Sequence, residues 1–352
     1  MLKRGGRRDI LHCGDSRMKL GRQTYAPEKR VYISQVADIA GSDEACGNLR
    51  GYIDQVLDCG EWGCDSHEKA ETRMREEAIR SLLEKAELSE CDVDLMLGGD
   101  LVNQIVPSAF SARSFDIPFS GLYCACATFG QAIAHASMAI GEGIGSAICC
   151  TSSHFATAER QYRFPLELGT QPTPTSQRTV TGAGAVLLTG KAPLWRCPEV
   201  TAYTFGRVID LGCTDANNMG AAMAPAAFDT ISVHLRETGR KAEYYDLIVT
   251  GDLGRLGREL LAQLMKREGV DESKNLNDCG CMIFAPGQKC GLGGSGAGCS
   301  SLVYCAYLHK LLVAGQIDRL LLVPTGALLS KDSSLQGESI PGIAYAVAIE
   351  CR

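Results

Sequence analysis

The stretch YCACATFG, residues 123–130, decides the fold of this chain. The apolar run before it, residues 117–123, predicts a buried strand, and the small and apolar residues 127–140 after it predict a helix. Cys126 therefore lies where a strand turns sharply into a helix. Free N–H groups at a helix start favour an anion, so Cys126 is either an activated nucleophile or the floor of an anion pocket. A small buried packing residue is the alternative.

The composition is that of a large globular protein. The 352 residues are 45% hydrophobic, and their length suggests two domains or two fused halves. The net charge of −6 gives no reason to expect a nucleic-acid partner. No apolar run approaches the roughly 18 residues that span a bilayer, and the basic start lacks the apolar core of a secretory signal. The 17 cysteines include no C-x-x-C pair, so we expect neither disulfides nor a metal site.

Two halves of the sequence echo each other. The segment that begins at Asp94 returns at Asp246, 152 residues later, and the cysteine turn at Cys126 returns at Cys299, 173 residues later. The order of the matched segments predicts a duplicated β/α unit with parallel strands and right-handed crossovers. A ligand would bind at the carboxyl ends of the strands, where the halves meet.

The same pattern divides the chain into three parts. Residues 1–30 are a polar lead-in, within which Met18 is an alternative start, residues 31–193 form the first half and residues 194–352 form the second. A capping box at residues 65–68 predicts a helix that runs to about Leu88. A second helix is expected at about 103–115, and a third at about 225–237.

Two β/α halves, with a cysteine at the strand–helix junction of the first, resemble the thiolase fold of thiolases and ketoacyl-synthase III enzymes. The resemblance implies an α/β protein whose duplicated halves pack in five layers, α-β-α-β-α. ACATFG, residues 125–130, is similar to the nucleophile turn of those enzymes. The histidine of the enzymes falls at Asp252 here, and their next Asn or His falls near Ser295.

A missing histidine removes the group that would activate the cysteine or polarise the substrate. We therefore expect no condensation chemistry, no catalytic residue other than Cys126 and no cofactor. Acyl transfer through Cys126, with coenzyme A as its cofactor, remains the alternative.

A narrower resemblance covers residues 19–350. The segments LGGDLVNQI, TVTGAGAV, NMGAAMAPAAFDT and YYDLIVTGDLG resemble the stage V sporulation protein AD family of spore-forming bacteria. This resemblance implies binding of dipicolinic acid (pyridine-2,6-dicarboxylate), free or as its calcium chelate, with uptake into the forespore and release at germination. It also implies membrane-protein partners from the stage V sporulation A operon. The location would be the forespore or spore, in the cytoplasm or peripheral on the inner spore membrane.

Two further expectations follow from these resemblances. Thiolase-fold enzymes are commonly dimers, so a homodimer is expected by analogy. A purely structural subunit of the spore membrane channel complex remains another alternative function.

A pocket for dipicolinate needs cations or N–H donors at two carboxylates and a flat wall. Arg160 and Arg163 follow a predicted strand that ends at His154, and their spacing would put both on one face of a helix. The alternatives are surface ion pairs for the arginines and a capping or packing role for His154. The full set of candidate ligand-binding residues is Cys126, Ala127, Thr128, His154, Arg160, Arg163, Asp252, Ser295 and Ser300.

Overall fold

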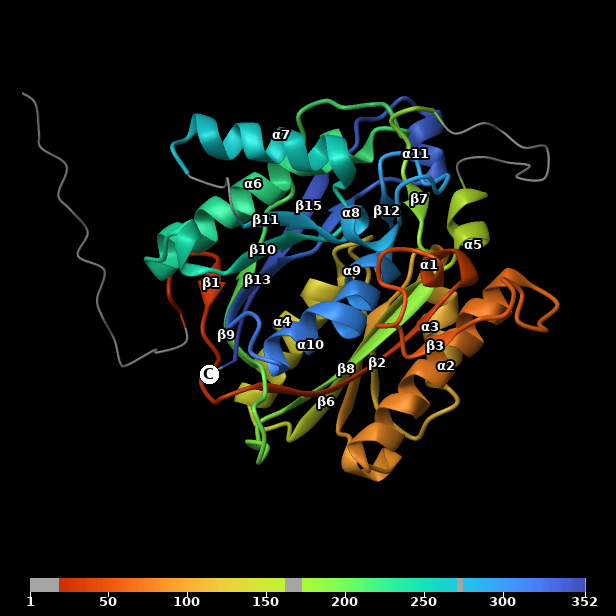
Figure 1. Cartoon of the computed structure of the whole chain (residues 1–352), viewed down its shortest axis with the longest axis vertical. Coiled ribbons are helices and arrows are strands. Elements are labelled where there is room, and N and C mark those ends of the chain that lie inside the picture. Colours follow the sequence, from red (N-terminus) through yellow and green to blue (C-terminus); the bar gives the residue numbers. More distant parts are fainter. Residues whose placement is uncertain (1–18, 162–172, 271–274, 352) are drawn as a thin grey trace, which may run out of the picture.

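The computed structural model describes residues 19–161, 173–270 and 275–351. The main path of the 13-stranded sheet has five strands from each half, in the same spatial order in both halves (Figure 1). Three short strands, β1 (Thr24–Tyr25), β3 (Gln55–Val56) and β14 (Thr325–Ala327), pair beside it. The first half has the order β2 (Tyr32–Ala40), β8 (Gly182–Thr189), β6 (Ser146–Ser153), β4 (Leu95–Gly99) and β5 (Phe119–Gly121). The second half has the order β9 (Glu199–Phe205), β15 (Gly342–Glu350), β13 (Arg319–Val323), β10 (Leu247–Thr250) and β11 (Leu276–Asp278). The matching order is the structural trace of the duplication.

Strand directions are mixed, so the prediction of parallel strands throughout was wrong. In the first half β4 pairs in parallel with β5 and β6, whereas β8 runs antiparallel to β6 and β2. In the second half β13 and β9 both pair antiparallel with β15. The strand that ends each half, β8 or β15, therefore lies antiparallel between two strands that are parallel to each other. The halves meet where β2 pairs with β9 at Tyr32 and Glu199.

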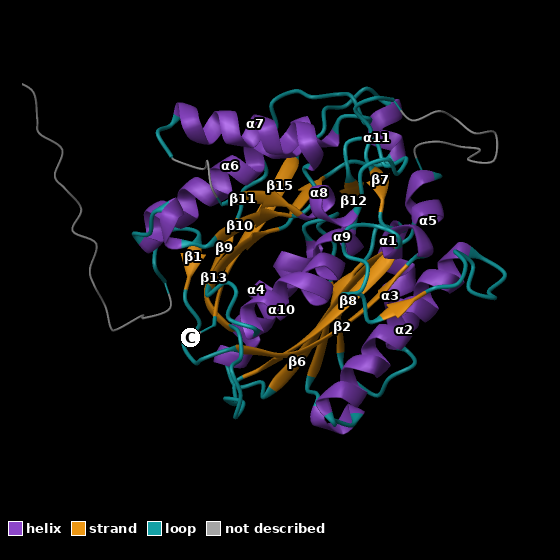
Figure 2. Ribbon diagram, in the orientation of Figure 1, coloured by secondary structure: helices purple, strands orange, loops and turns teal. Residues whose placement is uncertain are grey.

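Helices complete five layers, as the thiolase resemblance implies (Figure 2). Helices α2 (His67–Ala86) and α3 (Val106–Ala112) cover the outer face of the first half. Helices α6 (Met219–Thr238) and α7 (Gly254–Arg267) cover the outer face of the second. Between the halves lie α4 (Thr128–Gly141), α9 (Ala297–Val303) and α10 (His309–Val313), whose apolar residues form the central core.

Shorter elements join these layers. They are β1 (Thr24–Tyr25), α1 (Ser42–Ala45), β3 (Gln55–Val56), α5 (Phe155–Glu159), β7 (Arg178–Thr179), α8 (Cys279–Ile283), β12 (Gly294–Ser295), β14 (Thr325–Ala327) and α11 (Lys331–Leu335). Single helical turns at residues 90–92, 103–105, 242–244 and 304–308 complete the set. Within the described ranges, none of the helices has the length and apolar character needed to cross a membrane.

The capping box at the start of α2 is present in part. The Ser66 side chain accepts a hydrogen bond from the Lys69 N–H at 3.3 Å and so caps the first turn. Two other expectations differ from the structure. Helix α6 begins at Met219, six residues before the expected start, and the helix expected at 103–115 is regular only over α3. The backbone of Gln104 and Ile105 is left-handed, with φ of 59° and 48°, which separates the two turns.

Candidate functional site

Hydrogen bonds within the turn around Cys126 fix its conformation. Thr128 Oγ1 accepts from the Cys124 N–H at 2.9 Å and donates to the Ala125 carbonyl at 2.7 Å. Ala125 has φ of +48°, an uncommon conformation for a residue with a Cβ, and α4 begins two residues after Cys126. The turn therefore fixes where the Cys126 side chain points, as the sequence suggested. The strand before it is not buried: β5 spans three residues at the edge of the sheet, all of them partly or fully exposed.

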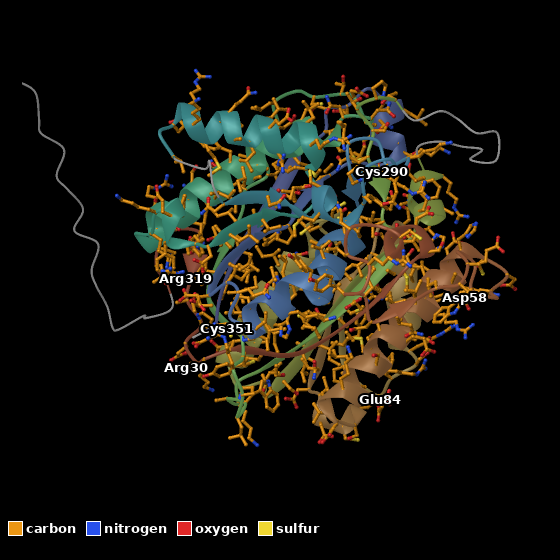
Figure 3. All side chains as sticks on the ribbon, viewed as in Figure 1. Arg30, Asp58, Glu84, Cys290, Arg319 and Cys351 are labelled. Atoms are coloured by element: carbon orange, nitrogen blue, oxygen red, sulfur yellow. The ribbon has the colours of Figure 1, made fainter. Side chains whose placement is uncertain are left out.

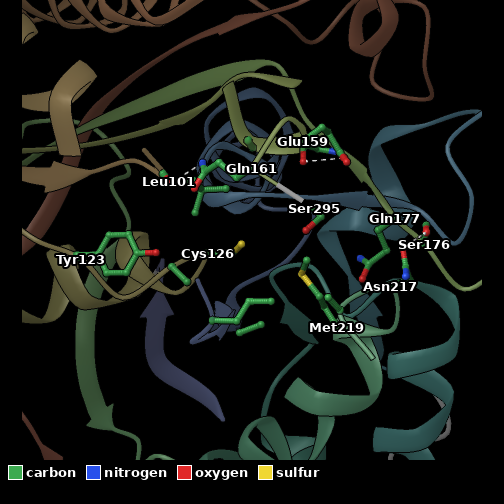
Figure 4. Close-up of a pocket in the computed structure, with 16 residues that line it drawn as sticks. Leu101, Tyr123, Cys126, Glu159, Gln161, Ser176, Gln177, Asn217, Met219 and Ser295 are labelled. Atoms are coloured by element: carbon green, nitrogen blue, oxygen red, sulfur yellow. Dashed lines mark hydrogen bonds between the residues drawn. The ribbon is translucent and has the colours of Figure 1, made fainter. Parts of the chain in front are cut away.

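Cys126 points into a cavity of about 120 Å³ (Figure 4). Tyr123 stands on one side of it and Ser176, Gln177 and Asn217 on the other. The residues that line it are Leu101, Tyr123, Ala125, Cys126, Ala158, Glu159, Gln161, Ser176, Gln177, Thr179, Ala216, Asn217, Met219, Ser295, Ala327 and Leu329. Sites for drug-sized ligands usually enclose about 300 Å³ or more, so this cavity suits a small and compact ligand.

Asp252 lies behind Cys126, at the position where the resemblance puts the histidine. Its carboxylate accepts hydrogen bonds from Thr325 Oγ1 at 2.8 Å, from Ser295 Oγ at 3.1 Å and from the Gly296 N–H at 3.1 Å. Burial raises the pKa of Asp252 to about 6.

The Cys126 thiol also hydrogen-bonds to the Asp252 carboxylate. Burial, and then the charge of Asp252, raise the pKa of this thiol well above its ordinary value. Cys126 is therefore a neutral thiol at pH 7, and its neighbour opposes the thiolate that a nucleophile requires.

The cavity wall is polar, and its described part contains no cation. None of the described lining residues is lysine, arginine or histidine. Gln161, Gln177 and Asn217 carry side-chain amides into its wall. Glu159 Oε1 accepts from the Thr179 N–H at 3.1 Å and from Thr179 Oγ1 at 3.0 Å, which fixes a second carboxylate at the rim. The electrostatics therefore favour a neutral ligand, or one that brings its own cation.

His154 is not among the described residues that line the cavity, so its ligand role stays a prediction that this placement does not support. Its Nε2 contacts the Gly60 carbonyl oxygen at 2.7 Å, and its Nδ1 accepts from the Ala156 N–H at 3.2 Å. The second bond caps α5. With both ring nitrogens bound to the backbone and burial lowering its pKa, His154 is a buried structural residue.

Four more candidates lie outside the cavity, and a fifth is not described. Arg160 forms an ion pair with Glu68 and is not among the lining residues. Ala127, Thr128 and Ser300 are fully buried, because they build the turn and the start of the central helices. None of these four is among the described residues that line the cavity, so their role as ligand contacts stays a prediction. Arg163 lies outside the described residues. The candidates that the structure brings together are Cys126, Asp252 and Ser295.

The sequence did not reveal the residues whose side-chain amides line one wall of the cavity. Gln177 Nε2 donates to the Asp252 carbonyl at 2.7 Å and to the Gly294 carbonyl at 2.9 Å, so it links the cavity wall to the loops that carry Asp252 and Ser295. Gln177 and Asn217 lie in irregular segments without hydrophobic periodicity, which gave no signal. Tyr123 did have a sequence signal, because it is an aromatic residue next to the cysteine turn. In the structure its side chain is 51% exposed.

Comparison with known proteins assigns the family. The profile described as stage V sporulation protein AD (SpoVAD) matches residues 21–350. Stage V sporulation protein AD of Bacillus subtilis (strain 168) is 40% identical over 338 residues, which cover 95% of this chain and 98% of that protein. The chain belongs to the stage V sporulation protein AD family.

Solved structures confirm the thiolase fold of this family member. OleA of Xanthomonas campestris is 15% identical, with a TM-score of 0.56 over 94% of this chain and 98% of that chain. The acyltransferase ChlB3 is also 15% identical, with a TM-score of 0.53 over 92% of this chain and 98% of that chain. At such low identity the likeness establishes the architecture alone.

Proposed function

We propose that this sporulation protein is a binding protein on an enzyme scaffold. It holds dipicolinic acid in the cavity at Cys126, for uptake into the forespore and release at germination. The observation that carries the proposal is Asp252, which occupies the place of the activating histidine and keeps Cys126 a neutral thiol. A cavity with a disabled nucleophile can still bind, and the identity of the ligand follows from the family resemblance.

The wall chemistry supports the calcium chelate as the bound form. The free dianion would face the buried Asp252 carboxylate, and the described lining contains no lysine, arginine or histidine. The chelate carries no net charge, and its pyridine ring can lie against Tyr123 while the Asn217 side-chain amide donates to a carboxylate oxygen. In this proposal the ligand supplies a cation, which the described lining residues do not.

The proposed setting follows the same resemblance. The protein would act in the forespore or spore, in the cytoplasm or peripheral on the inner membrane, beside membrane proteins of the stage V sporulation A operon. A homodimer would be compatible with β5 at the sheet edge, because its outer side has no strand partner among the described residues.

The test is calorimetric titration of dipicolinate into the purified full chain, with excess calcium and again with a chelator of calcium. Ala216→Phe places a ring at the cavity rim, and Ala192→Phe, on an exposed loop, is the matched control. We expect saturable binding that is tighter with calcium, weakened at least about tenfold by Ala216→Phe and unchanged by Ala192→Phe.

Two other outcomes would replace the proposal. Equal binding to the wild type and Ala216→Phe would place the ligand elsewhere. No binding, together with an acyl group trapped on Cys126 from an acyl-coenzyme A, would favour the acyltransferase instead. The nucleophile turn, which this chain retains, keeps that second function open to test.

A further inference from the structure

A second hollow lies on the far side of the loop that carries residues 284–293. Two neighbouring cavities of about 320 Å³ and 470 Å³ share Asn48, Arg258 and Cys281 in their linings. Together they form one groove, which we call the arginine groove. Neither of its linings shares a residue with the cavity at Cys126. Figure 3 labels Cys290, a lining residue, at the end of the molecule that carries α7 and α8.

The groove contains two arginines without an acidic partner. Arg255 Nη2 donates to the Gly291 carbonyl at 2.5 Å, and Arg258 Nη1 donates weakly to Asn277 Oδ1 at 3.4 Å. In the part of the chain that the structure describes, neither guanidinium forms an ion pair. Other surface arginines do pair, as Arg178 does with Asp43 at 2.6 Å. Each groove arginine therefore keeps N–H donors for a ligand.

The rest of the lining suits an anion. No described aspartate or glutamate lines either part of the groove. Tyr52 and Tyr307 meet edge to face at one end, with ring centroids 4.9 Å apart, and Tyr52 is 43% exposed. The groove thus combines two free positive charges with an aromatic flank, whereas the cavity at Cys126 combines carboxylates with neutral amides.

The wall between the arginines and the cavity is rigid. A Cβ on Gly291 would lie 2.0 Å from the Ser176 carbonyl oxygen, and one on Gly293 would lie 2.6 Å from the Gly280 carbonyl oxygen. The Leu292 N–H donates to Ser176 O at 2.9 Å. The loop is therefore fixed by close backbone contacts, so the groove is preformed.

We propose that the arginine groove is a second ligand site, which binds a small anion bearing carboxylate or phosphate groups. Arg255 and Arg258 would hold the acidic groups, and the Tyr52–Tyr307 pair would flank the rest of the molecule. This site is separate from the proposed chelate site, because its chemistry selects the free anion.

The experiment titrates sodium pyrophosphate and calcium-free dipicolinate separately into the full chain. The variants are Arg255→Gln, Arg258→Gln and both together, with Arg267→Gln at the exposed far end of α7 as the matched control. A charge-assisted hydrogen bond contributes roughly 1.5–3 kcal/mol, so we expect each groove variant to weaken binding about ten- to hundredfold. Arg267→Gln and Ala216→Phe should bind as the wild type does.

The outcomes separate this site from the proposed chelate site. Binding of pyrophosphate alone would identify a phosphate ligand, and binding of dipicolinate alone a carboxylate ligand. Equal affinity in the wild type and the double variant, or no saturable binding of either anion, would refute the proposal that the arginine groove is a ligand site. Loss of chelate binding in Ala216→Phe, with the groove titration unchanged, would leave both proposals standing.

Discussion

The duplication gives each half a buried aspartate at the same place, and the two differ in their surroundings. Asp100 follows β4 and Asp252 follows β10, the matching strand of the second half. Asp100 accepts from the N–H groups of Val102 at 2.8 Å and Ser108 at 2.9 Å, and the charge of Arg75 opposes the rise in its pKa that burial causes. Asp252 has hydroxyl, thiol and backbone N–H partners, and no guanidinium of the described residues pairs with it. Asp100 is part of a buried hydrogen-bond network, whereas Asp252 lies behind the cysteine that lines the cavity.

The first prediction breaks the network of the first half. Arg75 is fully buried, donates to Ser111 Oγ at 3.2 Å and to the Gly99 carbonyl at 3.2 Å, and is the cation near Glu71 and Asp100. Arg75→Met would leave buried carboxylates without it, and we expect a loss of about 3–5 kcal/mol in the free energy of unfolding. Urea titration measures this. Arg80→Gln, on the exposed face of α2, should cost less than about 1 kcal/mol, and equal losses would contradict the network.

The second prediction concerns the pH dependence of the second half. Burial raises the pKa of Asp252 from 3.8 to about 6, so the folded state holds its proton more tightly than the unfolded chain does. Stability from this group is therefore present below about pH 4 and lost as the pH rises to about 6, by about 3 kcal/mol. Asp252→Asn should remove that loss, so it should gain stability relative to the wild type between pH 4 and pH 7.

The measurement is urea titration at both pH values. Asp58→Asn is the control, because Asp58 is an exposed surface residue (Figure 3). A constant difference between Asp252→Asn and the wild type across this range would show that Asp252 is ionised at both pH values.

Sequence alone predicted much of this comparison. The repeated segments at Asp94 and Asp246 aligned Asp100 with Asp252, and buried strands repeat because both faces of the sheet are covered. The partners of the aspartates could not be found in this way. Arg75 comes from a helix whose charged residues look like an exposed face. β5 was predicted as buried because its sequence is apolar, yet an edge strand is covered on fewer sides.

The site shows the same limit. Cys126 was found because it lies at a predicted strand–helix turn, and Asp252 was found because the thiolase resemblance puts the histidine of the enzymes there. The lining amides Gln161, Gln177 and Asn217 come from segments that have no counterpart in the other half. Their position depends on long-range contacts such as the bond from Gln177 to the Asp252 carbonyl, which leave no local pattern in the sequence.

The third prediction compares the two cysteine turns. In the second half Gly298 takes the place of Ala125, and its N–H donates to Ser153 Oγ at 3.1 Å. A Cβ there would lie 2.3 Å from the Gly182 carbonyl oxygen, so Gly298→Ala should destabilise the protein by about 1–3 kcal/mol. Gly141→Ala, at a position in α4 with open space around it, should be neutral or slightly stabilising. Thermal unfolding measures both, and a neutral Gly298→Ala would mean that the halves can separate at this contact.

The last prediction returns to the thiol of Cys126, where the smallest effect is expected. Replacing Asp252 by Asn removes the second cause of the raised thiol pKa but leaves the first, which is burial. We therefore expect a gain of only about tenfold in the alkylation rate of Cys126 at pH 8, because a lower thiol pKa raises the fraction present as thiolate. Mass spectrometry of the alkylated peptides measures the rate, with exposed Cys91 in the same sample as the internal reference. If the ratio of the Cys126 rate to the Cys91 rate does not change, burial alone keeps Cys126 unreactive. Many cysteines of this protein are buried, whereas the contact with Asp252 belongs to Cys126. An unchanged ratio would therefore remove the main argument that the aspartate at position 252 keeps this cysteine unreactive.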